Sequence, residues 1–265
     1  MKNKKSLFLF TIGLLFVTLL GFAAIYEKKQ QPDEPISATA FKLNTVVTVN
    51  IYDSADKKLL DEVMELCDQY EKLFSRTLSS SEISQLNNQT LKQENGAFIL
   101  SSETAELISK GLYYGSLSDG AFDIAIAPIS SLWDFTSEEK KVPADEAIQA
   151  ALPLVNYEDV SIEGNKLTFA KEGMGLDLGA IAKGYIADKM KEFLVSKGVK
   201  SATINLGGNV LCIGKKPDNT PFRIGIQKPF ADRSETIAVL DIEDKSVVSS
   251  GIYERYFEKD GAFYH

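Results

Sequence analysis

Hydrophobic residues recur with two different periods along this chain, and the change from one period to the other marks the predicted elements. Apolar positions three and four residues apart predict helices over 55–74, 101–117 and 143–152. Apolar and β-branched residues that alternate with polar ones predict a strand over 41–52. Two shorter runs predict a hairpin over 160–169 that turns at Gly164-Asn165. Because helices and strands are interleaved in this way, the pattern favours the α+β class.

The last third of the sequence is predicted to consist mainly of strands. These strands cover 201–206, 208–213, 222–227, 236–242 and 246–249. A turn at 259–261 predicts a return strand from Ala262, and the sequence stops a few residues into it. We therefore interpret the chain as truncated at its C-terminus or as an incomplete gene model. The expected fold is a mixed or antiparallel sheet with packed helices over 55–74, 101–117 and 178–196.

One predicted helix is unusual because small residues cover much of its surface. It becomes helical at about Leu178, and Asp177 occupies the N-cap position, where its carboxylate can accept from free amides of the first turn. Gly179 and Gly184 lie inside the helix. Each costs roughly 1 kcal/mol against Ala, which indicates the close approach of another group.

Two interpretations of this helix remain open. Asp177, Ala180 and Lys183 are spaced three apart and share one face near the positive end of the helix dipole. This arrangement suits an anionic, phosphate-bearing ligand. Tight packing of the helix on a sheet, with Asp177 as an ordinary cap, explains the same residues and is the simpler interpretation on physical grounds alone.

The first residues of the chain predict a membrane segment. A short basic stretch precedes residues 6–26, which are uncharged and mostly apolar. About 20 such residues can span a bilayer, and the preceding positive charges keep that end in the cytoplasm. We expect an uncleaved anchor that holds the rest of the chain at the extracytoplasmic face of the cell membrane. The alternative is a signal peptide cleaved near 21–24, which would export the chain.

Charge, cysteine and histidine content exclude some classes of partner and site. The 265 residues carry a net charge of −8 without a basic stripe, which argues against nucleic acid as a partner. Cys67 and Cys212 are far apart without metal-ligand spacing, so two buried free thiols are preferred over a disulfide. The single histidine, His265, excludes a multi-histidine metal site. Phe122 and Trp133, in the loop after the second helix, are interpreted as core or as a binding edge.

Six short segments, taken together and in this order, resemble the ApbE family of FAD:protein FMN transferases. The likeness covers roughly residues 40 to 265. The segments are Phe41 to Val47, Phe74-Ser75-Arg76 with Ser81 to Asn87, Asp119 to Asp123, Asp177 to Tyr185, Asn205 to Asn209, and Ser249-Ser250-Gly251 with Tyr253-Glu254-Arg255. The predicted organisation is an anchor or signal over 1–29, a linker over 30–39 and an ApbE-like domain over 40–265.

The resemblance implies an enzyme that uses Mg²⁺ to transfer the FMN half of FAD to a threonine of a target flavoprotein, releasing AMP. It also implies two lobes with FAD in the cleft between them. The residues that match the family's FAD-binding positions are Leu43, Ala121, Phe122, Asp123, Asp177 and Lys183. The Ala180 carbonyl would ligate Mg²⁺, and Lys183 would lie against the pyrophosphate as a point charge. No catalytic residue is assigned.

Two departures from the family pattern affect these expectations. The chain has Leu43-Asn44-Thr45 where the family usually has Met-Gly-Thr, so the apolar contact remains and the glycine is lost. Family members continue past residue 265 with segments that supply side-chain Mg²⁺ ligands, and His265 aligns one position before the family's functional histidine. With the Ala180 carbonyl alone, Mg²⁺ would bind poorly. We therefore expect weak FAD binding and little transfer by the chain as given.

These departures leave two alternatives to the transferase. The chain is then a catalytically inactive FAD-binding protein, or a membrane-anchored scaffold that keeps the fold without the reaction. The sequence does not identify the acceptor protein.

Overall fold

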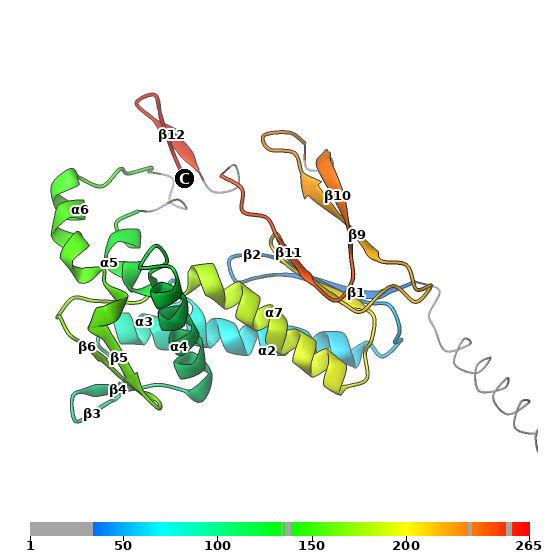
Figure 1. Ribbon diagram of the computed structural model, residues 1–265, viewed down its shortest axis with the longest axis horizontal. Helices are drawn as coiled ribbons and strands as arrows, with labels where there is room; N and C mark the ends of the chain where they lie inside the picture. Colours follow the sequence, from blue (N-terminus) through cyan, green and yellow to red (C-terminus); the bar gives the residue numbers. More distant parts are fainter. Residues whose placement is uncertain (1–33, 134, 136–138, 233–234, 253–255) are drawn as a thin grey trace, which may run out of the picture.

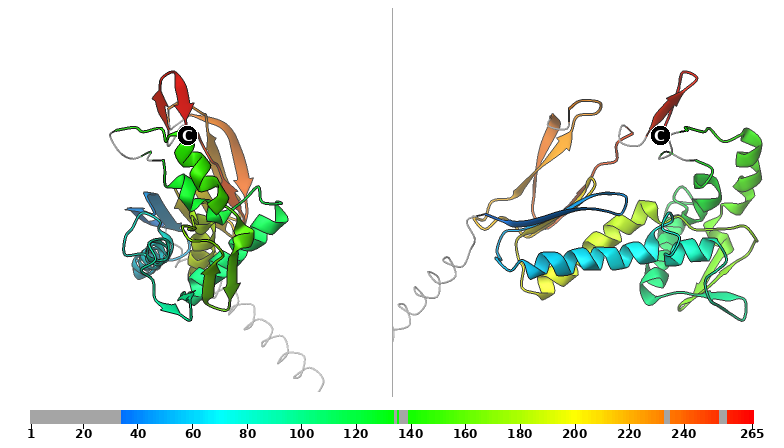
Figure 2. Two further views of the ribbon diagram at one scale, coloured as in Figure 1. Left: turned by 90° about the vertical axis from the view of Figure 1, so that its left-hand side faces the viewer. Right: turned by 180° about the vertical axis from the view of Figure 1, so that it is seen from behind.

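The structure is a computed structural model that describes residues 34–265 apart from 134, 136–138, 233–234 and 253–255. Its largest sheet has five strands in the order β1-β2-β7-β8-β11. These strands are β1 (Ile36–Lys42), β2 (Thr45–Ile51), β7 (Ala202–Leu206), β8 (Asn209–Ile213) and β11 (Ser246–Val248). Two long helices, α2 (Lys58–Phe74) and α7 (Gly179–Ser196), run side by side along one face of this sheet (Figures 1 and 2).

A second sheet lies toward the other end of these helices (Figure 1). It has four strands in the order β3-β4-β6-β5. They are β3 (Gln93–Glu94), β4 (Ala97–Ile99), β5 (Val160–Glu163) and β6 (Lys166–Phe169). The accompanying helices are α3 (Glu82–Asn87), α4 (Ser102–Leu117), α5 (Ala127–Ser130) and α6 (Asp145–Ala151), with 3-10 turns η1 (Ile124–Ile126), η2 (Leu152–Leu154) and η3 (Tyr157–Asp159).

Two further hairpins complete the part of the chain that the structure describes. They are β9 (Phe222–Gln227) with β10 (Thr236–Ile242), and β12 (Phe257–Lys259) with β13 (Ala262–Tyr264). Each strand pairing among the described residues is antiparallel. The α+β class and the antiparallel alternative for the sheets are thus confirmed.

The hydrophobic periods explain why these elements form one core. On β2 the inward-facing Val47, Val49 and Ile51 have no exposed side-chain surface, as the alternation predicted. On α2 the buried residues are Leu59, Leu60, Val63, Met64, Cys67 and Phe74, which form the apolar stripe of a helix. This stripe packs against α7 and β1. Both long helices therefore pack in the core against the five-stranded sheet.

Most predicted elements are present with boundaries shifted by a few residues. Serine side chains cap α3 and α4: Ser81 accepts from the Ser84 amide and Ser101 from the Thr104 amide. The hairpin over 160–169 is confirmed as β5 and β6, with Glu163 opposite Lys166. The sequence pattern missed β3 and β4, because strands of two and three residues leave almost no alternation to detect.

The prediction of one strand over 41–52 is wrong. Two strands, β1 and β2, meet at a two-residue turn formed by Leu43 and Asn44, with Lys42 opposite Thr45. Both turn residues have positive φ, 53° and 55°. These angles define a primed hairpin turn, which usually carries glycine. Because the sequence has no glycine here, nothing signalled the turn. β1 begins at Ile36, so residues 36–39 of the predicted linker are strand.

The predicted anchor at 6–26 lies outside the described residues. Within the part of the chain that the structure describes, no helix is long and apolar enough to cross a membrane. Cys67 and Cys212 are both free and buried, as predicted. Burial raises the pKa of Cys67 to about 12 and that of Cys212 to about 11.

Candidate functional site

A pocket of about 720 Å³ opens where the C-terminal end of α2, the β1–β2 turn and the first turns of α7 come together. All seven residues that the sequence singled out line it: Leu43, Ala121, Phe122, Asp123, Asp177, Ala180 and Lys183. They come from three segments that are at least 50 residues apart in the sequence. Their convergence is a property of the tertiary structure. The roles assigned to them in binding FAD and Mg²⁺ stay predictions.

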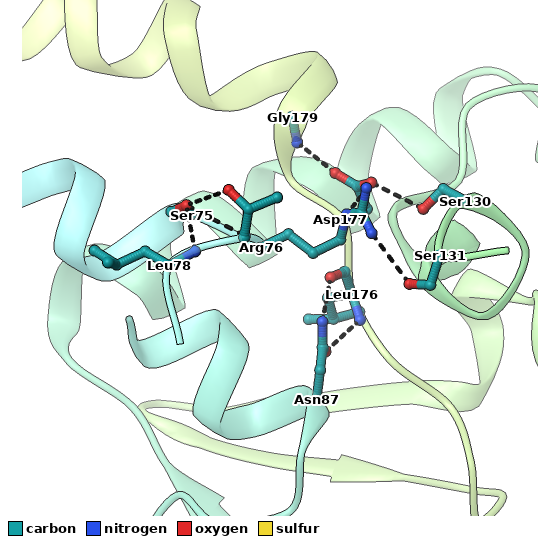
Figure 3. Close-up of polar contacts among 10 residues, drawn as sticks. Ser75, Arg76, Leu78, Asn87, Ser130, Ser131, Leu176, Asp177 and Gly179 are labelled. Atoms are coloured by element: carbon teal, nitrogen blue, oxygen red, sulfur yellow. Dashed lines mark hydrogen bonds and ion pairs between the residues drawn. The ribbon is translucent and has the colours of Figure 1, made fainter. Parts of the chain in front are cut away.

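Asp177 is the most highly connected of these residues. Its Oδ2 atom pairs with Arg76 Nε at 3.0 Å and accepts a hydrogen bond from Ser130 Oγ at 2.9 Å (Figure 3). Its Oδ1 atom accepts from the Gly179 amide at 2.9 Å. Arg76 in turn donates from Nη1 to Ser131 Oγ at 3.2 Å. This network ties the segment after α2 to the end of α5 and the start of α7.

The predicted N-cap needs a small correction. Leu178, not Asp177, occupies the cap position of α7, and it makes no side-chain cap bond. Asp177 nevertheless performs the capping function, because its carboxylate accepts from the Gly179 amide in the first turn. A Cβ on Gly179 would lie 3.0 Å from Asp177 Oδ1. Glycine is therefore explained at 179 by the approach of the Asp177 carboxylate.

The alternative interpretation, tight packing of the helix on a sheet, does not describe the first turns of α7. Gly179 and Ala180 are exposed. A Cβ added to Gly184 would meet its nearest described neighbour, Asn209 Nδ2, only at 3.9 Å. The tightly packed positions come later and include Ile186, Met190 and Leu194, which are fully buried. One helix thus faces a pocket at its start and the core along its remaining length.

A contact between helices fixes α7 just beyond its first turn. The Tyr185 hydroxyl donates to Glu106 Oε2 on α4 at 2.6 Å, and Lys189 Nζ lies 5.2 Å from the centre of the Tyr185 ring. Burial, followed by the hydrogen bond to Glu106, raises the pKa of Tyr185, so its proton stays on the hydroxyl. The helix that carries Lys183 is thereby tied to α4.

Asp123 lines the pocket and also supports its wall. Its Oδ1 atom accepts from the Ala125 amide at 2.7 Å, which caps η1, and its Oδ2 atom accepts from the Tyr157 amide at 2.9 Å. Phe122 is half-buried in the pocket lining, with its ring 6.3 Å from that of Tyr114. Trp133 lies outside the lining and packs near Phe135 and Tyr264. Only Phe122 of the two predicted aromatic residues therefore faces the pocket.

The β1–β2 turn carries the most strained backbone in the pocket lining. Leu43 and Asn44 both adopt left-handed angles, which cost roughly 1–2 kcal/mol for an ordinary residue and less for Asn. This explains why a glycine suits position 44 and why Asn is a tolerated replacement. The Leu43 amide donates to Glu71 Oε1 on α2 at 3.0 Å, and Lys42 forms an ion pair with Asp68, also on α2.

Sequence reasoning missed two charged residues of the lining, Glu71 and Arg76. Arg76 stands inside one of the segments that resemble the ApbE family, so a signal for it existed. Glu71 had no such signal, because its contact depends on the turn that the strand prediction overlooked. Both residues become visible only once α2 is placed against the β1–β2 turn and α7.

The fold and the pocket together define a class: an α+β protein with a pocket at the start of a helix. The sequence pattern of the ApbE family matches residues 43–265. The FAD:protein FMN transferase of Klebsiella pneumoniae is 35% identical over 86% of this chain and 70% of its own length. The transferase of the same name from Vibrio cholerae is 30% identical over 87% of this chain and 68% of its own length.

Solved structures give the same assignment. The ApbE protein of Thermotoga maritima superposes with a TM-score of 0.78 at 30% identity, covering 88% of this chain and 75% of that one. The flavin transferase ApbE of Vibrio cholerae gives 0.74 at 25% identity, covering 86% and 75%. This chain belongs to the ApbE family.

Proposed function

We propose that this chain is an FAD:protein FMN transferase that binds FAD in the pocket at the start of α7. Curated relatives that are at least 30% identical over most of this chain carry that name. The observation that carries the proposal for the site is that one pocket collects all seven matched residues. Its volume of about 720 Å³ lies within the range of roughly 300–1,000 Å³ that small-molecule and cofactor sites occupy.

The lining has the two kinds of surface that a flavin dinucleotide needs. Leu43, Phe122 and Ile126 supply apolar contacts for aromatic rings. Lys183 supplies a positive charge for the pyrophosphate, beside the helix start at Gly179 and Ala180. The dipole of a helix N-terminus favours bound phosphate in the same place, while the Gly179 amide itself is bonded to Asp177.

The proposed reaction is a phosphoryl transfer. A threonine hydroxyl oxygen of the acceptor protein attacks the phosphorus on the FMN side of the pyrophosphate. A P–O bond forms to threonine, the anhydride P–O bond to AMP breaks, and the hydroxyl proton passes to solvent. Catalysis of this kind depends mainly on positioning and on stabilising charge on the phosphates. Lys183 would offset that charge while the Asp177 network holds the first turn of α7 in place.

Mg²⁺ dependence is not supported by the described residues alone. In the part of the chain that the structure describes, no group of three or more His, Cys, Asp or Glu residues could hold a metal ion. Both oxygens of Asp123 and both oxygens of Asp177 already accept hydrogen bonds within the protein. The Ala180 carbonyl by itself does not make the near-octahedral oxygen site that Mg²⁺ requires. The reaction above therefore includes no metal-dependent step.

The experiment is incubation of the purified chain with FAD and a candidate acceptor flavoprotein, with and without added MgCl₂. The expected result is a small covalent FMN mass increase on an acceptor threonine, together with released AMP, because the Ala180 carbonyl alone would hold Mg²⁺ poorly. Lys183→Ala should weaken FAD binding by at least tenfold, since it removes a charge contact to phosphate. FAD binding without any mass increase on the acceptor would favour the inactive FAD-binding alternative. Absence of FAD binding would refute the proposed site.

The proposed location is the extracytoplasmic face of the cell membrane, with residues 6–26 as the anchor. The support is the basic start followed by an uncharged apolar run of about bilayer length. Fractionation of cells that express the full chain tests this. We expect the chain in the membrane fraction and sensitive to protease added outside the cytoplasm, and release by high salt would contradict an integral anchor.

A further inference from the structure

We propose that Glu71 is a positioning residue, which sets the β1–β2 turn so that Leu43 forms one wall of the FAD pocket. The inference rests on the proposed function, because it concerns the same pocket. No feature of the sequence singled out Glu71, and its contact to Leu43 links residues that are 28 positions apart.

The first observation is the unusual residue in the turn. A primed two-residue turn needs positive φ at both central positions and is usually built from Asn-Gly or Asp-Gly. Here the first central residue is a leucine with φ 53°. Leucine rarely adopts this conformation, and such backbone strain persists only where the surroundings enforce it. The Leu43 side chain is half-buried and lines the pocket, so the strained residue is also the one in position to contact the ligand.

The second observation is what enforces the turn. The Leu43 amide donates to the Glu71 carboxylate at 3.0 Å, and this charge-assisted bond spans from the turn to α2. One helical turn earlier, Asp68 pairs with Lys42, the residue before the turn. Asp68 and Glu71 are three apart and therefore share one face of α2. Two adjacent residues, Lys42 and Leu43, thus attach the turn to α2. Glu71 is the residue of α2 that binds Leu43.

The third observation concerns the charge of Glu71. An acidic side chain in a pocket for a phosphate-bearing ligand repels that ligand unless it is engaged elsewhere. The other two pocket carboxylates are engaged: Asp123 with the Ala125 and Tyr157 amides, and Asp177 with Arg76, Ser130 and the Gly179 amide. Glu71 follows the same rule, because its carboxylate binds the Leu43 amide. Each carboxylate fixes a backbone amide of a different part of the pocket wall.

The test compares Glu71→Ala with Glu71→Gln and uses Glu65→Ala as the matched control. Glu65 is exposed on the same helix and lies outside the pocket lining. A glutamine oxygen can still accept from the Leu43 amide, so Gln should preserve the turn while Ala releases it. Two measurements are made on each full-length variant. Hydrogen–deuterium exchange of the peptide containing Leu43 reports the turn without any ligand, and flavin fluorescence titration gives the Kd for FAD.

The expected result for Glu71→Ala is an increase of about tenfold both in the exchange rate of the Leu43 amide and in the Kd for FAD. Glu71→Gln should stay within about threefold of the unsubstituted chain in both measurements, and Glu65→Ala should change neither. Equal damage by Gln and Ala would show that the charge acts directly and would overturn the proposal. So would unchanged exchange in Glu71→Ala, or faster exchange with unchanged Kd. Failure of the unsubstituted chain to bind FAD would instead refute the proposed function, while the exchange data still test the attachment.

Discussion

Removing the Asp177 carboxylate should lower the stability of the protein as well as its affinity for FAD. The carboxylate accepts from Ser130 Oγ and the Gly179 amide at 2.9 Å each, and it pairs with Arg76 Nε at 3.0 Å. The side chains of Arg76 and Asp177 are 30% and 20% exposed. Water therefore still reaches part of both side chains. The ion pair should contribute less to stability than a fully buried pair would lose on removal of one partner.

The magnitude follows from these contacts. A capping bond to the first turn of a helix contributes about 1 kcal/mol. A hydrogen bond to a charged group contributes roughly 1.5–3 kcal/mol when it is well shielded, and an ion pair that water still reaches contributes about 1 kcal/mol. For Asp177→Ala we expect the free energy of unfolding to fall by about 3 kcal/mol, with contributions that are not strictly additive. Asp177→Asn keeps one oxygen acceptor, and should cost about 1–2 kcal/mol.

The assay is urea-induced unfolding at constant pH and salt, followed by circular dichroism and fitted to the free energy of unfolding. Glu65→Ala, on the exposed face of α2, is the control for the loss of one acidic side chain. A double-mutant cycle with Arg76→Ala isolates the ion pair, for which we expect a coupling of about 1 kcal/mol. If Asp177→Ala costs no more than Glu65→Ala, and the coupling is zero, the network in Figure 3 does not hold the start of α7.

Two further predictions concern the scaffold. Gly207 has φ 63°, and a Cβ there would lie 1.9 Å from Thr45 Oγ1, so Gly207→Ala should destabilise the protein by more than about 2 kcal/mol. Gly164→Ala, at φ 59° with open space around the added Cβ, isolates the backbone strain and should cost about 1 kcal/mol; equal losses in urea unfolding would show that the Thr45 contact is unimportant. Because burial raises the pKa of Cys67 to about 12 and of Cys212 to about 11, the thiols stay neutral in the folded protein while they ionise in the unfolded one. Their stabilising effect is complete below about pH 9 and is lost as pH rises toward 11–12, with a slope of at most about 1.4 kcal/mol per pH unit for each thiol. Thiol-reagent labelling at pH 8 should therefore require unfolding, and Cys67→Ala should flatten the fall in unfolding free energy above pH 9; fast labelling of the native protein would contradict the burial.

The sequence by itself determined the elements whose signals are local. The periodic apolar positions of α2, α4 and α7 and the alternation in β2 depend only on which residues stand a few positions apart, and the structure has these elements nearly where the pattern placed them. Ser81 and Ser101 cap their helices for the same reason. The matched segments also identified all seven predicted residues that line the pocket, since a family pattern marks residues without regard to distance in the chain.

Only the tertiary structure decided what those residues touch. The turn at Leu43 and Asn44 contains no glycine, so the sequence pattern does not predict it. Contacts from Lys42 to Asp68 and from the Leu43 amide to Glu71 attach the turn to α2. Arg76 reaches Asp177 across about a hundred residues of sequence, which no local pattern encodes. The spacing of hydrophobic residues depends only on residues that are close together in the sequence, so it predicts helices and strands but not their partners. The partners of a partly buried carboxylate such as Asp177 are set by which helices and turns pack together, and so they appear only when the whole chain has folded.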